Sequence, residues 1–208
     1  MSNNECDRLA EQINENTEPR PRRFPAEHAI LTDYEHLVRR KRWVQRWDPE
    51  TRTLREEAFP CEGEVWSDAL ETAFREHDAV RIPANLGTIL IDRPLLLASG
   101  QALQVEPGCV IRQIPGPEGM PMLQNRACFD RAGRDRDILV EGGIWDGVRN
   151  DGRGRIGLQP GAFSGALSFG RIDGLTVTDV TLRDIDGFGC QIADATGFRT
   201  ERIRFDHT

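Results

Sequence analysis

The chain has 208 residues, of which 38% are hydrophobic and 29% are charged, and its formal net charge is −7. This composition suits a folded protein and excludes an intrinsically disordered one. The length accommodates one large domain, or one domain with a small appendage. The negative charge argues against general nucleic-acid binding. Since no run of about 18 apolar residues occurs, we expect no membrane-spanning helix.

The N-terminal segment and the cysteines bear on the compartment. The segment MSNNECDRLAEQ is polar and acidic and lacks the basic and apolar regions of a secretory signal, so we expect a cytoplasmic protein. The five cysteines, Cys6, Cys61, Cys109, Cys128 and Cys190, are far apart and form no CxxC pair. We therefore expect free thiols, no disulfide framework, no metal site and no cofactor.

Residues 1–65 are predicted to form an arm followed by a small α/β appendage. Prolines among charged residues are typical of an extended arm. Residues 26–40 place apolar side chains at helical spacing and predict a short amphipathic helix. Residues 42–47 and 53–55 flank the turn-forming segment Asp48-Pro49-Glu50-Thr51, which predicts a β-hairpin.

The basic run of residues 39–42 precedes Trp43 and Trp47, and this combination can hold phosphates and stack on bases. The alternative is a solvated basic segment next to a hairpin whose tryptophans pack inward. Acidic neighbours such as Glu50 and Glu62 offset much of the positive charge. We therefore favour the second interpretation and expect no nucleic-acid partner.

A second amphipathic helix is predicted over residues 66–77, with Ser67 or Asp68 as its N-cap. From Val80 onward, short runs of alternating apolar residues replace the helical spacing, and glycines separate the runs. The sequence therefore predicts an all-β region after this helix.

Three segments of the β region repeat, namely residues 137–146, 173–182 and 196–205. The last two begin 23 residues apart (196 − 173) and the first two 36 apart (173 − 137), with the glycine-rich loop 147–165 as the excess. A repeat of this size with short strands is what one coil of a β-solenoid requires, because inward side chains stack on their equivalents in the next coil. An antiparallel sandwich, with Asp-Gly hairpin turns, is the alternative.

Residues 66–208 resemble the pectate-lyase-like superfamily, and within it the polygalacturonase-type enzymes of glycoside hydrolase family 28. Four features carry the resemblance: the helix and first strand Ala69–Gly87, the coil Leu95–Ile111, the signature-like segment Asp137–Gly147, and the last two coils. The resemblance implies a right-handed single-stranded parallel β-helix, capped at its N-terminus by the helix at residues 66–77. It also implies a polysaccharide as substrate, and a pectin-like one in particular.

The resemblance supplies no catalytic residue. Polygalacturonase-type enzymes use carboxylates as acid and base, carried by an Asn-x-Asp segment and an Asp-Asp pair and followed by Gly-His-Gly and Arg-x-Lys segments. The β region of this chain contains none of the four. The sequence also stops at Thr208 on an ordinary strand without a cap. We therefore expect an incomplete, inactive N-terminal piece of such an enzyme, with possible self-association through its open last coil.

Two further functions remain open at this point. One is a non-catalytic glycan-binding or structural β-helix of the adhesin or tailspike kind. The other is a lyase, which would require a calcium site built from clustered acids. Clustered carboxylates on further coils would favour the enzyme, whereas further coils without them would favour the binding module.

Three residues are candidates for acid–base chemistry. Asp194 lies on a turn near the position where the family's cleft begins, and Asp206-His207 is an acid–imidazole pair. Adjacent strand residues point to opposite faces, so Asp206 and His207 cannot readily cooperate. The alternative is that these residues are a solvated turn and the end of a strand.

Five residues are candidates for contacts with a sugar. Trp145 and Asp146 could stack on a ring and accept its hydroxyls, although Asp146 could equally cap a turn. Arg149, Arg153 and Arg155 lie in one loop and suit an anionic sugar, because a guanidinium pairs with a carboxylate. The alternative for these arginines is an exposed loop without a ligand.

Overall fold

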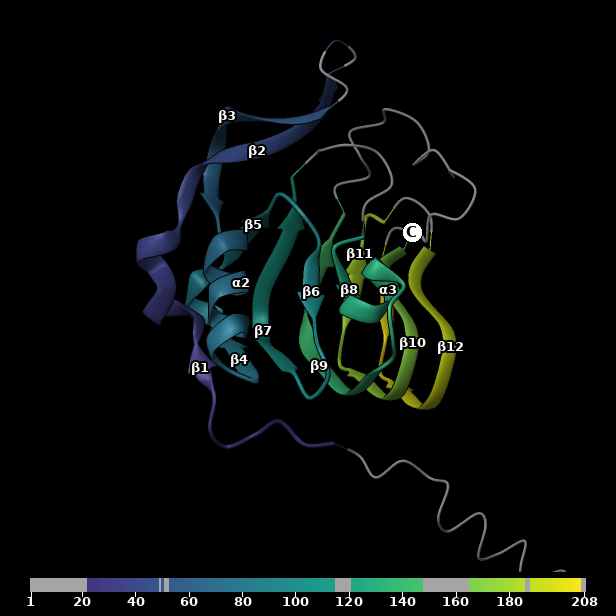
Figure 1. Ribbon diagram of the computed structural model, residues 1–208. Helices are drawn as coiled ribbons and strands as arrows, with labels where there is room; N and C mark the ends of the chain where they lie inside the picture. The colour runs from purple at the N-terminus through teal and green to yellow at the C-terminus, as the bar shows by residue number, and fades with distance from the viewer. Residues whose placement is uncertain are drawn as a thin grey trace, which may run out of the picture.

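The computed structural model describes residues 22–48, 50, 53–114, 121–147, 165–185 and 188–206. Strands dominate these residues, and the helices among them are few and short (Figure 1). In chain order the elements are β1 (Ala29–Ile30), η1 (Leu31–Leu37), β2 (Arg39–Asp48), β3 (Thr53–Val65), α2 (Ser67–Glu76), β4 (Ala79–Ile82), η2 (Ala84–Leu86), β5 (Thr88–Ile91), β6 (Leu95–Leu97), β7 (Ala102–Gln113), β8 (Leu123–Asn125), α3 (Arg126–Asp130), β9 (Asp135–Asp146), β10 (Gly165–Thr178), β11 (Thr181–Arg183), β12 (Phe188–Glu201) and β13 (Arg204–Asp206).

The strands form one curled, mixed sheet. Strands β2 and β3 pair antiparallel and project from the body as a hairpin, whereas the other pairs of described strands are parallel (Figure 1). Strand β7 pairs with β4 and β5 on one side and with β9 on the other, and β10 lies between β9 and β12. Parallel strands need long connections, whereas an antiparallel sandwich joins its strands by short hairpin turns. The observed pairing therefore excludes the antiparallel sandwich for the body of the fold.

Equivalent residues of successive strands form columns inside the curl. Val80, Leu103, Val140 and Val177 face one another in register across β4, β7, β9 and β10, and each is completely buried. A second column joins Ile111, Trp145 and Leu182, which are also fully buried. The alternating apolar pattern of the sequence therefore produces stacked layers, each of which is covered by its neighbours.

A column of left-handed residues turns the chain at one corner. Asp137, Gly174 and Gly197 occupy the same register position on β9, β10 and β12, and their φ angles are 53°, 81° and 61°. Glycine adopts positive φ freely, and aspartate is among the few other residues that tolerate it. The corner thus recurs in each repeat.

The predicted repeat is confirmed for its last two units and was wrong by one residue for the first. Asp173 pairs with Thr196, as the spacing of 23 requires. Asp173 faces Arg136, which makes the first separation 37 (173 − 136) rather than 36. The feature that the repeat units have in common at this corner is a residue with left-handed backbone, Asp137 in one unit and Gly174 in the next. The apolar side chains of each unit are in register when these two residues are aligned. A slip of one residue would have turned those side chains to the other face.

The predicted all-β character is confirmed at the level of strand content, and so are the helix at α2 and the hairpin of β2 and β3. The closed, right-handed coil of a solenoid is a stronger statement and stays a prediction. The helix predicted over residues 26–40 was wrong in type, since the chain forms β1 and then the 3-10 helix η1. None of the described helices has the length and apolar character needed to cross a membrane.

Helix α2 begins without the predicted side-chain cap. Trp66 occupies the N-cap position and makes no capping hydrogen bond through its side chain. The Ser67 hydroxyl instead accepts a hydrogen bond from the Asp92 backbone N–H (3.1 Å), and Asp68 is 2.5 Å from the guanidinium of Arg93. These contacts connect the start of the helix to the turn after β5, so they fix the helix on the sheet.

A buried polar network closes the corner near α3. The Asp135 carboxylate accepts hydrogen bonds from Asn125 Nδ2 (2.8 Å), the Ala127 backbone N–H (2.7 Å) and Ser99 Oγ (3.0 Å). Asn125 also exchanges two hydrogen bonds of 2.8 Å with the backbone of Gly170. Since buried polar groups are costly when unpaired, this network fixes three successive turns of the chain relative to one another.

Candidate functional site

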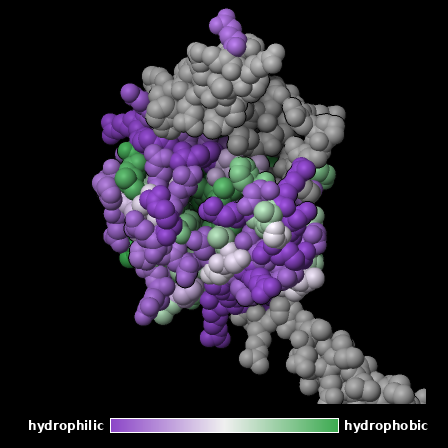
Figure 2. Space-filling view, in the orientation of Figure 1, coloured by the Kyte–Doolittle hydropathy of each residue, from purple (hydrophilic) through white to green (hydrophobic). Residues whose placement is uncertain are grey.

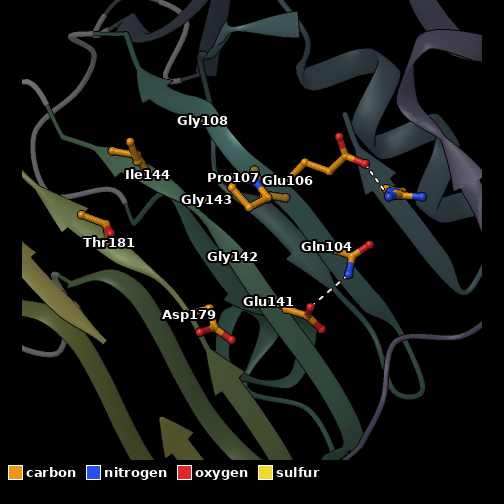
Figure 3. A pocket seen from close by; sticks show the side chains of 12 residues that line it. Gln104, Glu106, Pro107, Gly108, Glu141, Gly142, Gly143, Ile144, Asp179 and Thr181 are labelled. Carbon is orange, nitrogen blue, oxygen red and sulfur yellow. Dashed lines mark hydrogen bonds and ion pairs between the residues drawn. The ribbon is translucent and has the colours of Figure 1, made fainter. Parts of the chain in front are cut away.

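A groove of about 570 Å³ lies on the outer face of β4, β7 and β9 and extends to the turn before β11 (Figure 3). We call it the polar groove. Its lining residues come from four neighbouring segments: Arg81, Gln104, Val105, Glu106, Pro107, Gly108, Glu141, Gly142, Gly143, Ile144, Asp179 and Thr181. Figure 2 shows another view of the surface, in which hydrophilic residues surround a smaller hydrophobic area near the middle of the face.

The floor of the polar groove is bare backbone at Gly142 and Gly143. Both residues have positive φ, of 82° and 83°. A Cβ at Gly142 would stand 2.2 Å from the carbonyl oxygen of Val105, and one at Gly143 would stand 2.6 Å from the Val105 side chain. Only glycine fits this close approach of β9 to β7. Both glycines are themselves buried, so they serve the packing of β9 on β7 at the base of the groove.

The wall of the groove carries a row of polar side chains that the register brings together. Arg81, Gln104 and Glu141 occupy equivalent positions on β4, β7 and β9. The Gln104 side-chain amide donates a hydrogen bond of 3.0 Å to the Glu141 carboxylate (Figure 3). A carboxylate and an amide held side by side offer both acceptors and a donor, which is the chemistry that sugar hydroxyls need.

Ion pairs hold the two other carboxylates of the groove. Glu106 is 2.5 Å from a guanidinium nitrogen of Arg81 and also accepts a hydrogen bond of 2.9 Å from the Ala84 backbone N–H. Asp179 accepts hydrogen bonds of 2.5 and 2.7 Å from Arg202. The hydrogen bonds from Arg202 lower the pKa of Asp179, and so this carboxyl stays charged. A general acid requires the opposite shift.

Trp145 and Asp146 do not line the polar groove. Trp145 is completely buried, and its indole N–H donates a hydrogen bond of 3.2 Å to the Gly142 carbonyl oxygen, so no face of the ring is open for stacking. Asp146 is 4% exposed and lies between Arg112 and Arg183, whose guanidinium nitrogens approach it to 3.0 and 2.8 Å. Because these residues face one another in register, they form an ion-pair ladder across three strands.

The other predicted residues lie apart from the polar groove or outside the described residues. Asp194 is an exposed corner residue with a φ of 49°, and its carboxylate accepts a hydrogen bond of 2.7 Å from Arg134. Asp206 ends β13, where it pairs with Arg183. His207, Arg149, Arg153 and Arg155 lie outside the described residues.

The residues that the sequence analysis missed are Gln104, Glu141 and Asp179. They are separated by 37 residues or more in the chain (141 − 104 and 179 − 141 give 37 and 38), so no local motif contains them. The available signal was the repeat itself. Aligning its units at the left-handed corner places Glu141 opposite Thr178, one residue before Asp179.

Comparison with known proteins finds similarity in fold alone. No family model and no curated protein matches the chain. Two solved structures are similar in fold. One is a protein of Parabacteroides merdae classed provisionally as a glycosyl hydrolase, with a TM-score of 0.53 and 13% identity over 68% of this chain and 70% of that one. The other is the Streptococcus pneumoniae surface protein and adhesin PfbA, with a TM-score of 0.56 and 17% identity over 86% of this chain. The chain spans 41% of the adhesin's length.

Proposed function

We propose that the stacked strands are coils of a right-handed parallel β-helix and that the chain binds a polysaccharide in the polar groove. The observation that carries the proposal is the Gln104–Glu141 pair in the polar groove, since it places an amide and a carboxylate side by side where a sugar could meet both. Pro107 and Ile144 add apolar surface for the carbon face of a ring. Concave sites with a few convergent polar groups are where ligands commonly bind.

The architecture part of this proposal rests on three observations. Parallel strands recur at separations suited to one coil, inward residues form buried columns, and a left-handed corner recurs at the same position. The similarity to the two solved structures is consistent with it. One of the similar structures is named as a glycosyl hydrolase and the other as an adhesin. We therefore consider both hydrolysis and binding as functions of this chain.

The binding proposal is tested by titrating the chain with a panel of oligosaccharides and measuring heat. Gln104→Ala removes one hydrogen-bonding group of the groove, and it should weaken binding about fivefold to tenfold, since one hydrogen bond contributes roughly 1 kcal/mol. Gln113→Ala is the matched control, because Gln113 lies on the same strand and is not among the groove residues. Equal affinity of Gln104→Ala and the unaltered chain for every ligand that binds would contradict this site.

A second candidate function, glycoside hydrolysis, is favoured by the carboxylates Glu106, Glu141 and Asp179 in one groove. Glycosidases need a pair of carboxyl groups, one of them a general acid with a raised pKa. Asp179 shows the reverse shift and Glu106 is ion-paired, so we rank binding first. Release of reducing ends from a bound polysaccharide, abolished by Glu141→Gln, would reverse this order.

A further inference from the structure

The polar groove carries an excess of negative charge. Its lining includes three carboxylates, Glu106, Glu141 and Asp179, and one cation, Arg81. Arg81 forms an ion pair with Glu106 (Figure 3). Arg202, which does not line the groove, forms an ion pair with Asp179. Because both arginines are ion-paired within the protein, they are not available to neutralise an anionic ligand. Among the described groove residues, Glu141 is then the charged group whose charge is not balanced by an arginine.

Glu141 is paired with an uncharged group. Within the described residues its hydrogen bond comes from the Gln104 amide, which orients the carboxylate without neutralising it. The side chain is half-buried on the outer face of β9. A carboxylate in a concave site keeps much of its field, because low-dielectric walls limit screening. A ligand carboxylate next to Glu141 would therefore meet repulsion, whereas a sugar hydroxyl would donate to it.

We infer that the polar groove takes uncharged polysaccharides and rejects polymers of sugar acids. The inference rests on the proposed function and narrows it. It differs from the pectin-like substrate that the sequence resemblance implies, since pectin-like chains carry a carboxylate on each acidic ring. Gln104 and Glu141 would hold ring hydroxyls within the polar groove.

Size-matched oligosaccharides test the inference on the full chain. The neutral probes are cello-, xylo- and manno-oligosaccharides, and the anionic probe is an oligogalacturonide of the same length. At about 20 mM salt we expect the anionic probe to bind at least about tenfold more weakly than the best neutral one, because two like charges about 4 Å apart repel by more than the thermal energy near a protein surface. This gap should narrow at about 500 mM salt, where the Debye length is only a few ångströms.

The variant Glu141→Gln separates charge from shape. It keeps a hydrogen-bonding group and removes the charge, so the ratio of anionic to neutral affinity should rise about fivefold or more, even though the neutral probes lose part of their affinity with the carboxylate. Glu35→Gln is the matched control, since it alters net charge equally at an exposed residue outside the groove. It should leave every affinity unchanged.

The possible results separate this inference from the proposed function. Binding of the oligogalacturonide as tightly as the neutral probes, in the unaltered chain at both salt concentrations, overturns the inference and leaves the binding function standing. Absence of binding for every probe overturns both. Neutral binding with the salt-sensitive rejection of the anionic probe supports both, even if Glu141→Gln fails to fold.

Discussion

Leu175 and Phe198 occupy equivalent positions on neighbouring strands but differ in how much of each is covered. Leu175 on β10 packs between Ile138 of β9 and Phe198 of β12 and is 1% exposed. Phe198 has Leu175 on one side and no paired strand on the other among the described residues, and it is 50% exposed. If stacking between strands stabilises the fold, truncating the covered residue should destabilise the chain much more than truncating the open one.

The magnitudes follow from burial. Leu175→Ala removes a buried side chain and leaves a cavity, which costs about 3 to 5 kcal/mol. Phe198→Ala loses about half of the transfer free energy of a phenylalanine, or roughly 1 kcal/mol, and leaves no enclosed cavity. For a chain of this size these costs correspond to a fall in Tm of about 6–20 °C for the first variant and about 2–4 °C for the second.

Thermal unfolding of both variants, monitored by circular dichroism at several protein concentrations, provides the measurement. An equal loss for the two variants would refute the reasoning, because it would mean that Phe198 is covered in solution. If that loss also grew with protein concentration, the cover would be a second copy of the chain. Self-association through the last coil, which the sequence predicts, would then explain it, and light scattering would detect the larger mass.

Three more predictions concern individual groups. Asp135→Ala should cost about 2 kcal/mol or more of unfolding free energy, since it removes the acceptor of two buried donors, Asn125 Nδ2 and the Ala127 backbone N–H; a chemical-denaturation midpoint unchanged from that of the unaltered chain would contradict this. Gly142→Ala should cost more than about 3 kcal/mol or prevent folding, because it adds a steric clash to the strain of a positive φ; Gly87→Ala, at a position with positive φ but open space, should cost only the backbone strain of about 1–3 kcal/mol. Hydrogen bonds from Arg202 lower the pKa of Asp179 in the folded state. The small contribution of this pair to stability is therefore present above the pKa of an ordinary aspartate and is lost as the pH falls through the folded-state pKa. Arg202→Ala should remove that part of the pH dependence of Tm.

Much of the fold could be predicted because it depends on short-range patterns. Alternating apolar residues predict strands, and the 23-residue spacing fixes Asp173 opposite Thr196. The position of Asp137 shows the limit of such reasoning. Its left-handed φ makes it the equivalent of Gly174, and this property of the backbone is not visible in the residue type. The 3-10 helix η1 was missed for a similar reason, since its apolar spacing also fits an α-helix.

The candidate site could not be predicted because it depends on register. Gln104 and Glu141 become neighbours only when β7 and β9 pair with a specific offset. Residue types alone directed attention to Trp145 and Asp146, because aromatic and acidic residues are common at sugar sites. Both belong to buried layers, where Trp145 fills the core and Asp146 joins two arginines. Strand register therefore buries Trp145 and Asp146, which the sequence suggested as ligand groups, and brings Gln104 and Glu141 together in the groove.

Binding and hydrolysis place opposite demands on the same carboxylates. A hydrolytic groove must keep one carboxyl protonated near neutral pH, which requires burial or a like charge without a cation. In the polar groove, Arg81 forms an ion pair with Glu106, and the hydrogen bonds from Arg202 lower the pKa of Asp179. Only Glu141 is free of an arginine partner among the described groove residues, and one carboxylate cannot serve as both acid and base in the usual two-carboxylate mechanism. The charges of the groove thus favour the proposed binding of a polysaccharide over the alternative of cleavage.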